Sequence, residues 1–518
     1  MEHTVLACVV LSATAVLDAA RILAVFPTPS ISHQFVFRPI TQELARRGHD
    51  VTVITADPAF PKNLAPGNLT EIDVHDISYS VWENDLNKVS VGTGNDMNAQ
   101  LEMFIHLFAH IFEQQVQTDE VQNIIKNKNN HFDLILVEAC VRTTLIFSHI
   151  YKAPVIMISS FGPMVGTNSI VGAPNHPLFQ PVVVRQRLYN LTLWEKIREI
   201  YQQYKFEQIS HSLEYEENMM LKKIFGPETP SLSELYNNVD MVFFNVHPIW
   251  IDNQPVPPSV IYMGGMHQNP EKELPKDLQS YLDSSKHGVI YLSFGTNVQP
   301  SVLPPHKIKM MMKVFSELPY DVIWKWDKDL PGKPSNIKVL EWLPQSDLLR
   351  HPKMKLFIMQ GGLQSTDEAI TAGVPLIGIP VIADQWFNVE KYVRHGIGMK
   401  LEMGLFSENG FKNAILTVIE DPSYKNNIIR LRTVFRDQPQ APLERVIWWT
   451  EYVLRHGGAK HLRAPAANMS WAEYYQVNLV VFLLTCIFII LSVICVILYY
   501  IIQFFLRVIP QSIKLKVL

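Results

Sequence analysis

Short apolar runs alternate with helical patterns along most of this 518-residue chain. Apolar runs of this length, bounded by turn residues, are typical of buried strands, and buried strands joined by helices pair in parallel. We therefore expect an α/β fold in which helices cover both faces of parallel sheets. The expected strands are 21–26, 50–56, 132–138, 154–159 and 241–246 in the first half, and 288–293, 321–326, 337–342, 355–359 and 375–379 in the second.

The two sets of strands predict two Rossmann-like domains that face one another. Between its apolar ends the chain is long enough for two domains of about 230 residues each. A stretch rich in Pro and Gly separates the two sets and is expected to be the linker. The expected boundaries are 21–254 for the N-terminal domain, 255–275 for the linker, 276–440 for the C-terminal domain and 441–476 for a helical return and juxtamembrane segment.

Helices are expected between the strands, at 34–47, 97–114, 306–317 and 366–372. In 97–114 apolar residues recur at helical spacing, so this helix is expected either to line an acceptor pocket or to pack in the core. His106 and His110 are four residues apart, which suits zinc, but the Glu of an H-E-x-x-H pattern is absent. We expect a structural role for both histidines.

Apolar segments at both ends indicate export and membrane anchoring. Residues 5–16 are apolar except for Ser12 and Thr14, and small residues follow, so 1–20 is predicted to be a secretory signal peptide, although its first residues lack Lys and Arg. Between 479 and 502 lie 24 residues without a charge, which as a helix extend about 36 Å and cross a bilayer. We expect a single transmembrane helix at 477–502 and a basic cytoplasmic tail at 503–518, with the bulk of the chain lumenal.

Composition and short motifs argue against some classes of protein and indicate the cellular compartment. A formal net charge of -4 provides no electrostatic surface for nucleic acid. Four cysteines cannot build a disulfide scaffold, and only Cys140 lies outside the signal and the span. Glycosylation sequons precede the span at Asn68, Asn190 and Asn468. Residues 514–518 resemble a dilysine signal for retrieval to the endoplasmic reticulum membrane, although ordinary juxtamembrane basic residues explain them equally well.

The segment from Trp342 to Gln385 concentrates groups that suit a nucleotide sugar. Ligands of open parallel sheets bind at the carboxyl ends of the strands. Gly361-Gly362 follows an expected strand end and precedes a helix, with Gln364 or Ser365 as the expected N-cap, and backbone N–H groups at such a helix start bind diphosphate.

Flanking residues complete this predicted site. Trp342 offers a flat face for a base, and Gln345 can read the edge of that base. Glu368 can accept hydrogen bonds from the hydroxyls of a ribose, and Asp384-Gln385 supplies groups for the hydroxyls of a sugar.

This segment, W-L-P-Q-S-D-L-L followed by F-I-M-Q-G-G-L-Q-S-T-D-E-A-I-T-A-G-V-P-L-I-G-I-P-V-I-A-D-Q, resembles the signature of the UDP-glycosyltransferase family. That family consists of type I membrane enzymes and includes the UDP-glucuronosyltransferases. The likeness extends to 293–296, 421–425, 437–439 and 455–463, and is weakest between residues 60 and 240. Gln360, where many members carry His, is similar to insect members. The resemblance implies a GT-B fold followed by one transmembrane helix.

The resemblance also implies roles for single residues in binding a UDP-sugar donor. Trp342 stacks on uracil, Gln345 bonds to it, and Glu368 holds the ribose. The groups implied at the diphosphate are Gln360 and the Gly361-Gly362 turn, with Thr296 nearby. Gln364 and Ser365, at the expected helix start, are also predicted to be donor-binding residues. Asp384 and Gln385 are implied to bind the donor sugar.

An inverting transfer needs a general base, because an alcohol does not ionise near neutral pH. His33, in the loop expected before helix 34–47, stands where members of the family place their catalytic His. Glu138, at the end of strand 132–138, matches the acid that orients this His, with Glu in place of the commoner Asp. Asp133 is expected to be a strand-start residue.

No metal or other cofactor is expected, because UDP leaves as a stable anion. The one D-x-D pattern, Asp327-Lys-Asp329, falls in an expected loop and is a weak metal candidate.

The expected reaction is transfer of a hexose, glucose by preference, to a hydroxyl of a small lipophilic acceptor such as a phenol or plant toxin, as in detoxification. Between Asp252 and His267 there is no Lys or Arg to pair with a glucuronate carboxylate, which favours UDP-glucose as the donor. UDP-glucuronate is the alternative donor. A non-catalytic membrane-anchored UDP-sugar-binding homologue is the second alternative. A nicotinamide dehydrogenase is disfavoured because Gly92-Thr-Gly94 is followed by Met97 rather than Gly. The sequence leaves open whether the protein forms homo- or hetero-oligomers.

Overall fold

The computed structural model describes residues 19–62, 64–89, 96–127, 129–268, 270–296, 303–327 and 330–508. Several features discussed above lie outside this set. They are the predicted signal peptide up to residue 18, Gly92 and Gly94, Asp329, and the tail from residue 509 with its basic residues. The chain forms two units, of which the first ends at Pro465 and the second begins at Ala466.

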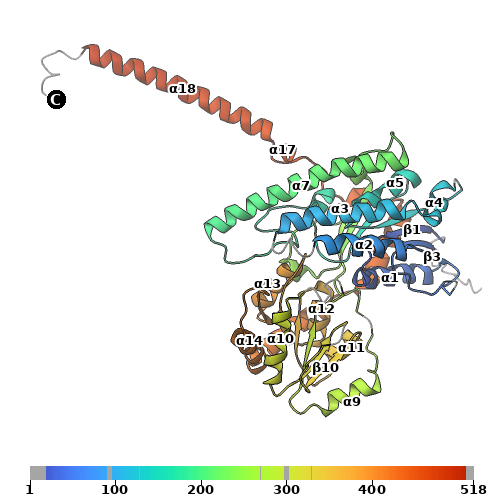
Figure 1. Ribbon diagram of the computed structural model, residues 1–518. Helices are drawn as coiled ribbons and strands as arrows, with labels where there is room; N and C mark the ends of the chain where they lie inside the picture. The colour runs from blue at the N-terminus through green and yellow to red at the C-terminus, as the bar shows by residue number, and fades with distance from the viewer. Residues whose placement is uncertain are drawn as a thin grey trace, which may run out of the picture. The chain divides into compact units, whose positions relative to one another are not determined.

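The first unit contains two parallel sheets, each the centre of one lobe (Figure 1). The N-terminal lobe has a seven-stranded sheet in the order β3-β2-β1-β4-β5-β6-β7. Its strands are β1 Arg21–Phe26, β2 Asp50–Thr55, β3 Leu69–Asp73, β4 Leu134–Glu138, β5 Val155–Ser159, β6 Val239–Phe244 and β7 Val260–Tyr262. Every neighbouring pair is parallel, so all carboxyl ends lie along one edge.

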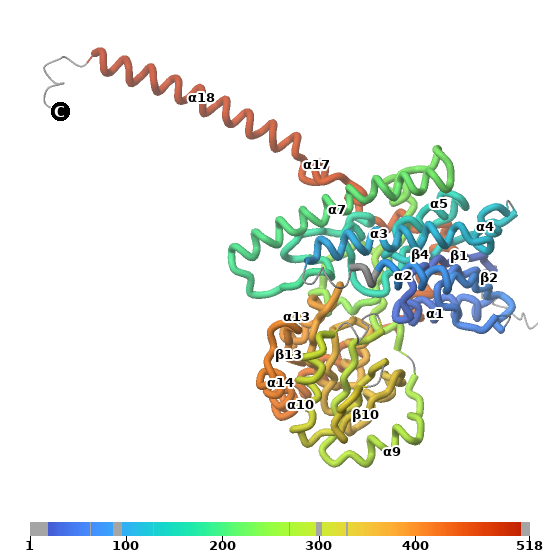
Figure 2. Tube along the Cα trace, in the orientation of Figure 1, coloured from blue at the N-terminus to red at the C-terminus, as the bar shows by residue number. Residues whose placement is uncertain are grey.

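The C-terminal lobe has a six-stranded sheet in the order β10-β9-β8-β11-β12-β13, also wholly parallel. Its strands are β8 Val289–Ser293, β9 Asp321–Lys325, β10 Ile337–Leu340, β11 Met354–Met359, β12 Leu376–Gly378 and β13 Gly398–Lys400. Both sheets have the parallel Rossmann-type arrangement predicted from the alternation of apolar runs and helices. In Figure 2 this lobe is yellow to orange, and the N-terminal lobe is blue to green.

Helices connect the strands of both lobes. In the N-terminal lobe they are α1 Ile31–Arg46, α2 His75–Val89, α3 Met97–Gln115, α4 Asp119–Lys126, α5 Ile146–Tyr151, α6 Thr167–Val171, α7 Leu193–Phe225 and α8 Leu232–Leu235. In the C-terminal lobe they are α9 Lys276–Ser284, α10 Pro305–Ser316, α11 Gln345–Arg350, α12 Leu363–Ala372, α13 Gln385–His395, α14 Glu408–Glu420 and α15 Pro422–Arg436.

The chain returns to the N-terminal lobe after α15. Helix α16, Pro442–His456, packs beside α1, and its Val446 and Ile447 join a core cluster with Ile22 and Val36. Asp240, at the start of β6, accepts hydrogen bonds from the backbone N–H of Ala459 and of Val155. The return segment therefore belongs to the core of the first lobe.

Some boundaries differ from the sequence expectations. Helix α1 begins at Ile31 rather than 34, so His33 lies in its first turn and not in the preceding loop. This start was missed because residues 31–33 are only partly buried and the apolar periodicity begins with Val36 and Phe37. Strand β7 lies within the expected linker 255–275 and completes the first sheet.

The second unit consists mainly of one long apolar helix. After α17, Trp471–Tyr474, helix α18 runs from Val477 to Val508 and has a mean hydropathy of 3.3 over its most apolar window. By length and composition α18 is able to cross a membrane. It extends past the predicted end at 502 because that end followed the uncharged run, whereas residues 503–508 contain no Gly or Pro that would end the helix.

Candidate active site

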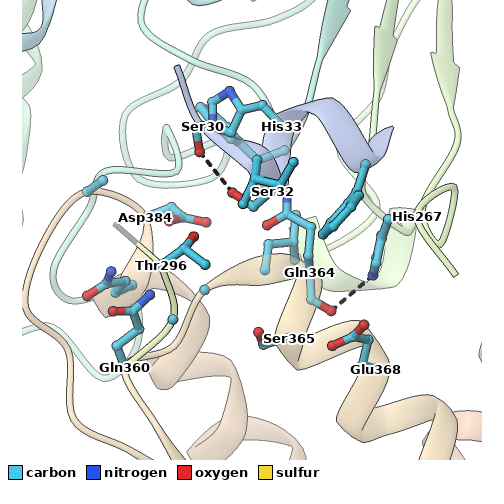
Figure 3. A pocket seen from close by; sticks show the side chains of 18 of the residues that line it. Ser30, Ser32, His33, His267, Thr296, Gln360, Gln364, Ser365, Glu368 and Asp384 are labelled. Carbon is cyan, nitrogen blue, oxygen red and sulfur yellow. Dashed lines mark hydrogen bonds between the residues drawn. The ribbon is translucent and has the colours of Figure 1, made fainter. Parts of the chain in front are cut away.

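The carboxyl ends of the two sheets line one cavity of about 410 Å³. Residues that follow β1 enter it from the N-terminal lobe, and residues that follow β8, β10, β11 and β12 enter it from the C-terminal lobe (Figure 3). The predicted site residues that line it are His33, Thr296, Trp342, Gln345, Gln360, Gly362, Gln364, Ser365, Glu368, Asp384 and Gln385.

A histidine and a buried carboxylate form a pair at the N-terminal wall of this cavity. His33 Nδ1 lies 2.7 Å from Glu138 Oε1, and the side chain of Glu138 has no exposed surface. A carboxylate only accepts, so Nδ1 carries a proton and Nε2 is the nitrogen with a free lone pair. The backbone N–H of Thr28 donates to the second carboxylate oxygen at 3.1 Å and holds it in place.

The imidazole is framed by aromatic rings. The centroids of Phe161 and Phe37 lie 5.6 and 6.4 Å from that of His33, both in edge-on arrangements. Leu101, Phe104 and Phe108 of α3 extend this apolar wall into the cavity. Other residues of the same helix, including Ile111, are buried in the core, so α3 both lines the pocket and packs.

On the opposite side, a hydrogen-bond network joins α11 to α12. Glu368 Oε1 accepts from Ser346 Oγ and Oε2 accepts from Gln345 Nε2, both at 2.5 Å. The Gln345 amide also donates to Ser365 Oγ at 2.8 Å, and its oxygen accepts from Tyr291 OH at 3.0 Å. Gln345, which was predicted to bind the base, is therefore in direct contact with Glu368, which was predicted to bind the ribose.

Trp342 and Lys325 stand together at the mouth of the cavity. The Trp342 side chain is 60% exposed, so one ring face is open to a planar ligand. Lys325 Nζ lies 4.7 Å from the ring centroid and donates to the Gly295 carbonyl at 3.2 Å. Burial lowers the pKa of Lys325.

Two glycine-containing turns form the floor below these groups. Gly361 has φ +104, and an added Cβ would lie 2.6 Å from Val389 Cγ2 and 2.9 Å from Gln385 O, so only glycine fits. Gln360 packs against Gly295, and its buried Oε1 has no partner within the described part of the chain. The first-turn N–H groups of α12, which begins at Leu363, have no acceptor within the helix.

The expectation that Gln364 or Ser365 caps α12 was wrong. The N-cap is Gly362, and the helix starts at Leu363, because the turn is tight enough to begin the helix at once. Ser365 lies in the first turn and accepts from Gln345. Gln364 Nε2 donates to the Ser160 carbonyl of the other lobe at 2.9 Å, and His267 Nε2 lies 3.0 Å from the Gln364 carbonyl.

The loop after β12 places a carboxyl group near His33. Burial raises the pKa of Asp384 to about 6, against a hydrogen bond from Asn388 and the nearby His33, which lower it. Gln385 Oε1 accepts from the backbone N–H of Val381 at 2.7 Å and of Ile382 at 2.9 Å. The Gln385 side chain is thus left with its NH₂ group as the donor to a ligand.

A thiol lies beside the imidazole–carboxylate pair. Potential ligand atoms of His33, Glu138 and Cys140 all lie within 4.8 Å of one another. Burial and the Glu138 charge raise the pKa of the Cys140 thiol, and a protonated thiol is a poor metal ligand. The cysteines that the structure describes, Cys140, Cys486 and Cys495, are free.

Other predicted residues lie outside the cavity. His106 Nδ1 lies 3.6 Å from Glu216, and His110 Nδ1 lies 2.9 Å from Asp85, both on a largely exposed face. Asp133 accepts from the backbone N–H of Arg21 and so fixes the start of β4 next to β1. Sequence reasoning missed Lys325, whose only signal was its position at the end of an expected strand.

The fold is that of two-domain GT-B glycosyltransferases. Among solved structures, the glycosyltransferase of kitacinnamycin matches with a TM-score of 0.56 and 18% identity, covering 84% of this chain and 98% of its own. Glycosyltransferase VinC in complex with dTDP matches with a TM-score of 0.56 and 15% identity, covering 84% of this chain and 100% of its own. At these identities the likeness concerns the fold alone.

Sequence comparison gives the family. The family model described as UDP-glucoronosyl and UDP-glucosyl transferase matches residues 21–511. An ecdysteroid UDP-glucosyltransferase of Spodoptera littoralis nuclear polyhedrosis virus is 35% identical, over 91% of this chain and 95% of its own length. UDP-glucosyltransferase 2 of Dactylopius coccus is 30% identical over 90% of both chains. The chain belongs to the UDP-glycosyltransferase family.

The fit of Gly361 can be tested by adding one methyl group. Gly361→Ala is expected to destabilise the first unit by about 1–3 kcal/mol, because the new Cβ is strained by the positive φ and meets Val389 and Gln385. Gly404→Ala is the control, because nothing lies within 4 Å of its added Cβ. Thermal unfolding in detergent compares the two, and equal melting temperatures would show that the turn at Gly361 is not restricted.

Proposed function

We propose that the protein catalyses inverting transfer of glucose from UDP-glucose to a hydroxyl of a small lipophilic acceptor, with His33 as the general base. The observation that carries this proposal is the short His33–Glu138 hydrogen bond on the wall of a cavity shared with the donor-binding segment of the family. A non-catalytic sugar-binding homologue would not need an intact pair of this kind, which disfavours that alternative.

In the proposed reaction the acceptor hydroxyl lies against His33 Nε2. The imidazole removes the hydroxyl proton as the oxygen forms a bond to C1 of the glucose. The bond between C1 and the diphosphate oxygen breaks on the opposite face, and its electron pair leaves with UDP. The buried Glu138 carboxylate stabilises the imidazolium that forms and keeps Nε2 directed at the acceptor. This scheme needs no metal ion or other cofactor.

The donor half of the cavity supports the remaining assignments. Uracil stacks on the open face of Trp342, and Glu368 binds the ribose. Because Gln345 donates to Glu368, we propose that it also reaches the ribose, in addition to the predicted contact with uracil. The diphosphate lies over Thr296, Gln360, Gly361 and Gly362 at the start of α12, and Asp384 and Gln385 bind the glucose.

Glucose is the proposed sugar for two reasons. Relatives at 30–35% identity carry the name UDP-glucosyltransferase. A glucuronate carboxylate would also lie near Asp384, whose charge repels it above pH 6. Lys325 does not reverse this preference, because its Nζ lies between Trp342 and the Gly295 carbonyl, at the base and diphosphate end of the proposed site rather than beside Asp384.

The acceptor is proposed to be lipophilic because α3 provides an apolar wall next to His33. The viral relatives are named for ecdysteroids, so a polyhydroxylated steroid belongs with phenols among the test acceptors.

The proposed setting is the endoplasmic reticulum membrane, with α18 as the anchor and the first unit lumenal. Of the three sequons, Asn190 is exposed and suits a glycan. Asn68 is less suitable, because its Nδ2 donates to the carbonyls of Ala45 and His49.

Donor choice is tested with detergent-solubilised protein and equal concentrations of UDP-glucose or UDP-glucuronate, each with a panel of phenols and a polyhydroxylated steroid. The expected product is a glucoside whose anomeric configuration is inverted relative to the donor, as read by NMR. A glucuronide as the main product would overturn the choice of glucose, and a retained configuration would overturn the mechanism.

The role of His33 is tested with His33→Ala. Loss of the base is expected to lower kcat by about 100- to 10,000-fold while UDP binding stays unchanged. His110→Ala is the matched control, because His110 also contacts a carboxylate but lies away from the cavity. Transfer at the wild-type rate by the His33 variant would exclude it as the base.

The charge of Asp384 predicts a pH dependence of donor binding. Its raised pKa of about 6 means that the carboxyl group is ionised above pH 6 and protonated below. An ionised carboxylate accepts more strongly from glucose hydroxyls, so KM for UDP-glucose is expected to rise severalfold between pH 7.5 and pH 5. Asp384→Asn should show a higher KM that is flat over this range. A wild-type KM that is constant with pH would contradict the assignment.

A further inference from the structure

At the wall of the cavity, Gln100 of α3 contacts the loop that follows β12. Its side chain is 2% exposed, and its Oε1 accepts from the backbone N–H of Ala383 at 3.1 Å. Gln100 belongs to the N-terminal lobe, and Ala383 belongs to the C-terminal lobe. A group of the acceptor-binding half therefore holds the backbone immediately before Asp384.

The residue held in this way has an unfavourable backbone conformation. Ala383 has φ +55, in the left-handed region that residues with a Cβ rarely adopt. Such a conformation persists only where surrounding contacts enforce it. One contact comes from within the loop, where Gln385 accepts from Val381 and Ile382, and the other comes from Gln100.

Apolar packing holds the same loop against α3. Trp386, which follows Gln385, is 3% exposed and forms a cluster with Met97 and Leu101 of α3 and with Phe206 of α7. Leu101 also lines the cavity beside His33. The helix that forms the acceptor wall is thus the surface on which the sugar-binding loop rests.

We propose that Gln100 is a positioning residue that directs Asp384 and Gln385 at the donor sugar, so that the acceptor lobe takes part in sugar recognition. This inference rests on the proposed function of Asp384 and Gln385 as sugar ligands. Gln100 acts on the sugar only through the loop, so recognition of the UDP portion, formed by α11, α12 and Trp342, does not depend on it.

The test compares the affinities of UDP-glucose and UDP for the full-length protein in detergent, by calorimetry. Gln100→Met keeps the size of the side chain but removes the acceptor. It is expected to weaken UDP-glucose binding by about tenfold, the value of one hydrogen bond, and to leave UDP binding unchanged. Gln100→Glu keeps an oxygen that accepts from Ala383 and is expected to restore most of the UDP-glucose affinity. Gln100→Ala serves if the methionine variant does not fold.

Gln115→Met is the matched control for the loss of a buried amide. Gln115 lies on the same helix, is 1% exposed, and donates to Pro27 O and Ser78 Oγ, away from the loop. The Gln115→Met variant is expected to be less stable but to keep the ratio of the UDP-glucose affinity to the UDP affinity. The inference fails if Gln100→Met leaves this ratio unchanged, if Gln115→Met changes it equally, or if Gln100→Glu loses as much as Gln100→Met. Because binding is measured without an acceptor, these outcomes are distinct from a failure of glucosyl transfer, which the donor assay detects.

Discussion

A fully buried carboxylate, that of Glu138, fixes the direction of the His33 imidazole at the cavity wall. Glu138 ends β4 at the centre of the first sheet, where the parallel strands present their carboxyl ends to the C-terminal lobe. An unpaired charge at this depth would be costly, and the contacts with His33 and Thr28 offset that cost. The same contacts determine that Nδ1 is protonated and that Nε2 faces the cavity. The proposed chemistry follows from this orientation, because a general base can remove a proton only from a group that lies within hydrogen-bond reach of its free nitrogen.

The remaining geometry depends on how the two lobes meet. Trp250 donates to Asn388 at 2.8 Å, Gln364 donates to Ser160, and Lys391 donates to Asp252 at 2.5 Å. The side chain of Lys391 has no exposed surface, so separation from Asp252 would leave a buried cation without its partner. These contacts define one relative position of the two lobes, which the proposed reaction between two bound substrates requires.

Much of the fold could be predicted because buried parallel strands are continuous apolar runs, as β1 and β4 show by starting and ending within two residues of expectation. Strands β3, β7 and β13 were missed because they are short or partly exposed edge strands. The residues of the donor segment were predicted through local motif chemistry, and most of them line the cavity. Lys325 and Gln100 were not, because their importance comes from contacts with residues 17 and 283 positions away, which no local pattern encodes.

The two departures from the commoner family pattern have different physical consequences. Glu138 is longer than Asp by one methylene, yet its Oε1 lies 2.7 Å from His33 Nδ1, so the extra length does not prevent the hydrogen bond. Gln360 is the larger change, because a neutral amide cannot balance the diphosphate as a protonated imidazole could. The proposed donor site still has positive potential from the start of α12 and from Lys325, whose Nζ contacts the Gly295 carbonyl beside Thr296. With the positive charge on β9 rather than on the turn after β11, the side-chain NH₂ of Gln360 needs only to donate a neutral hydrogen bond to the proposed diphosphate.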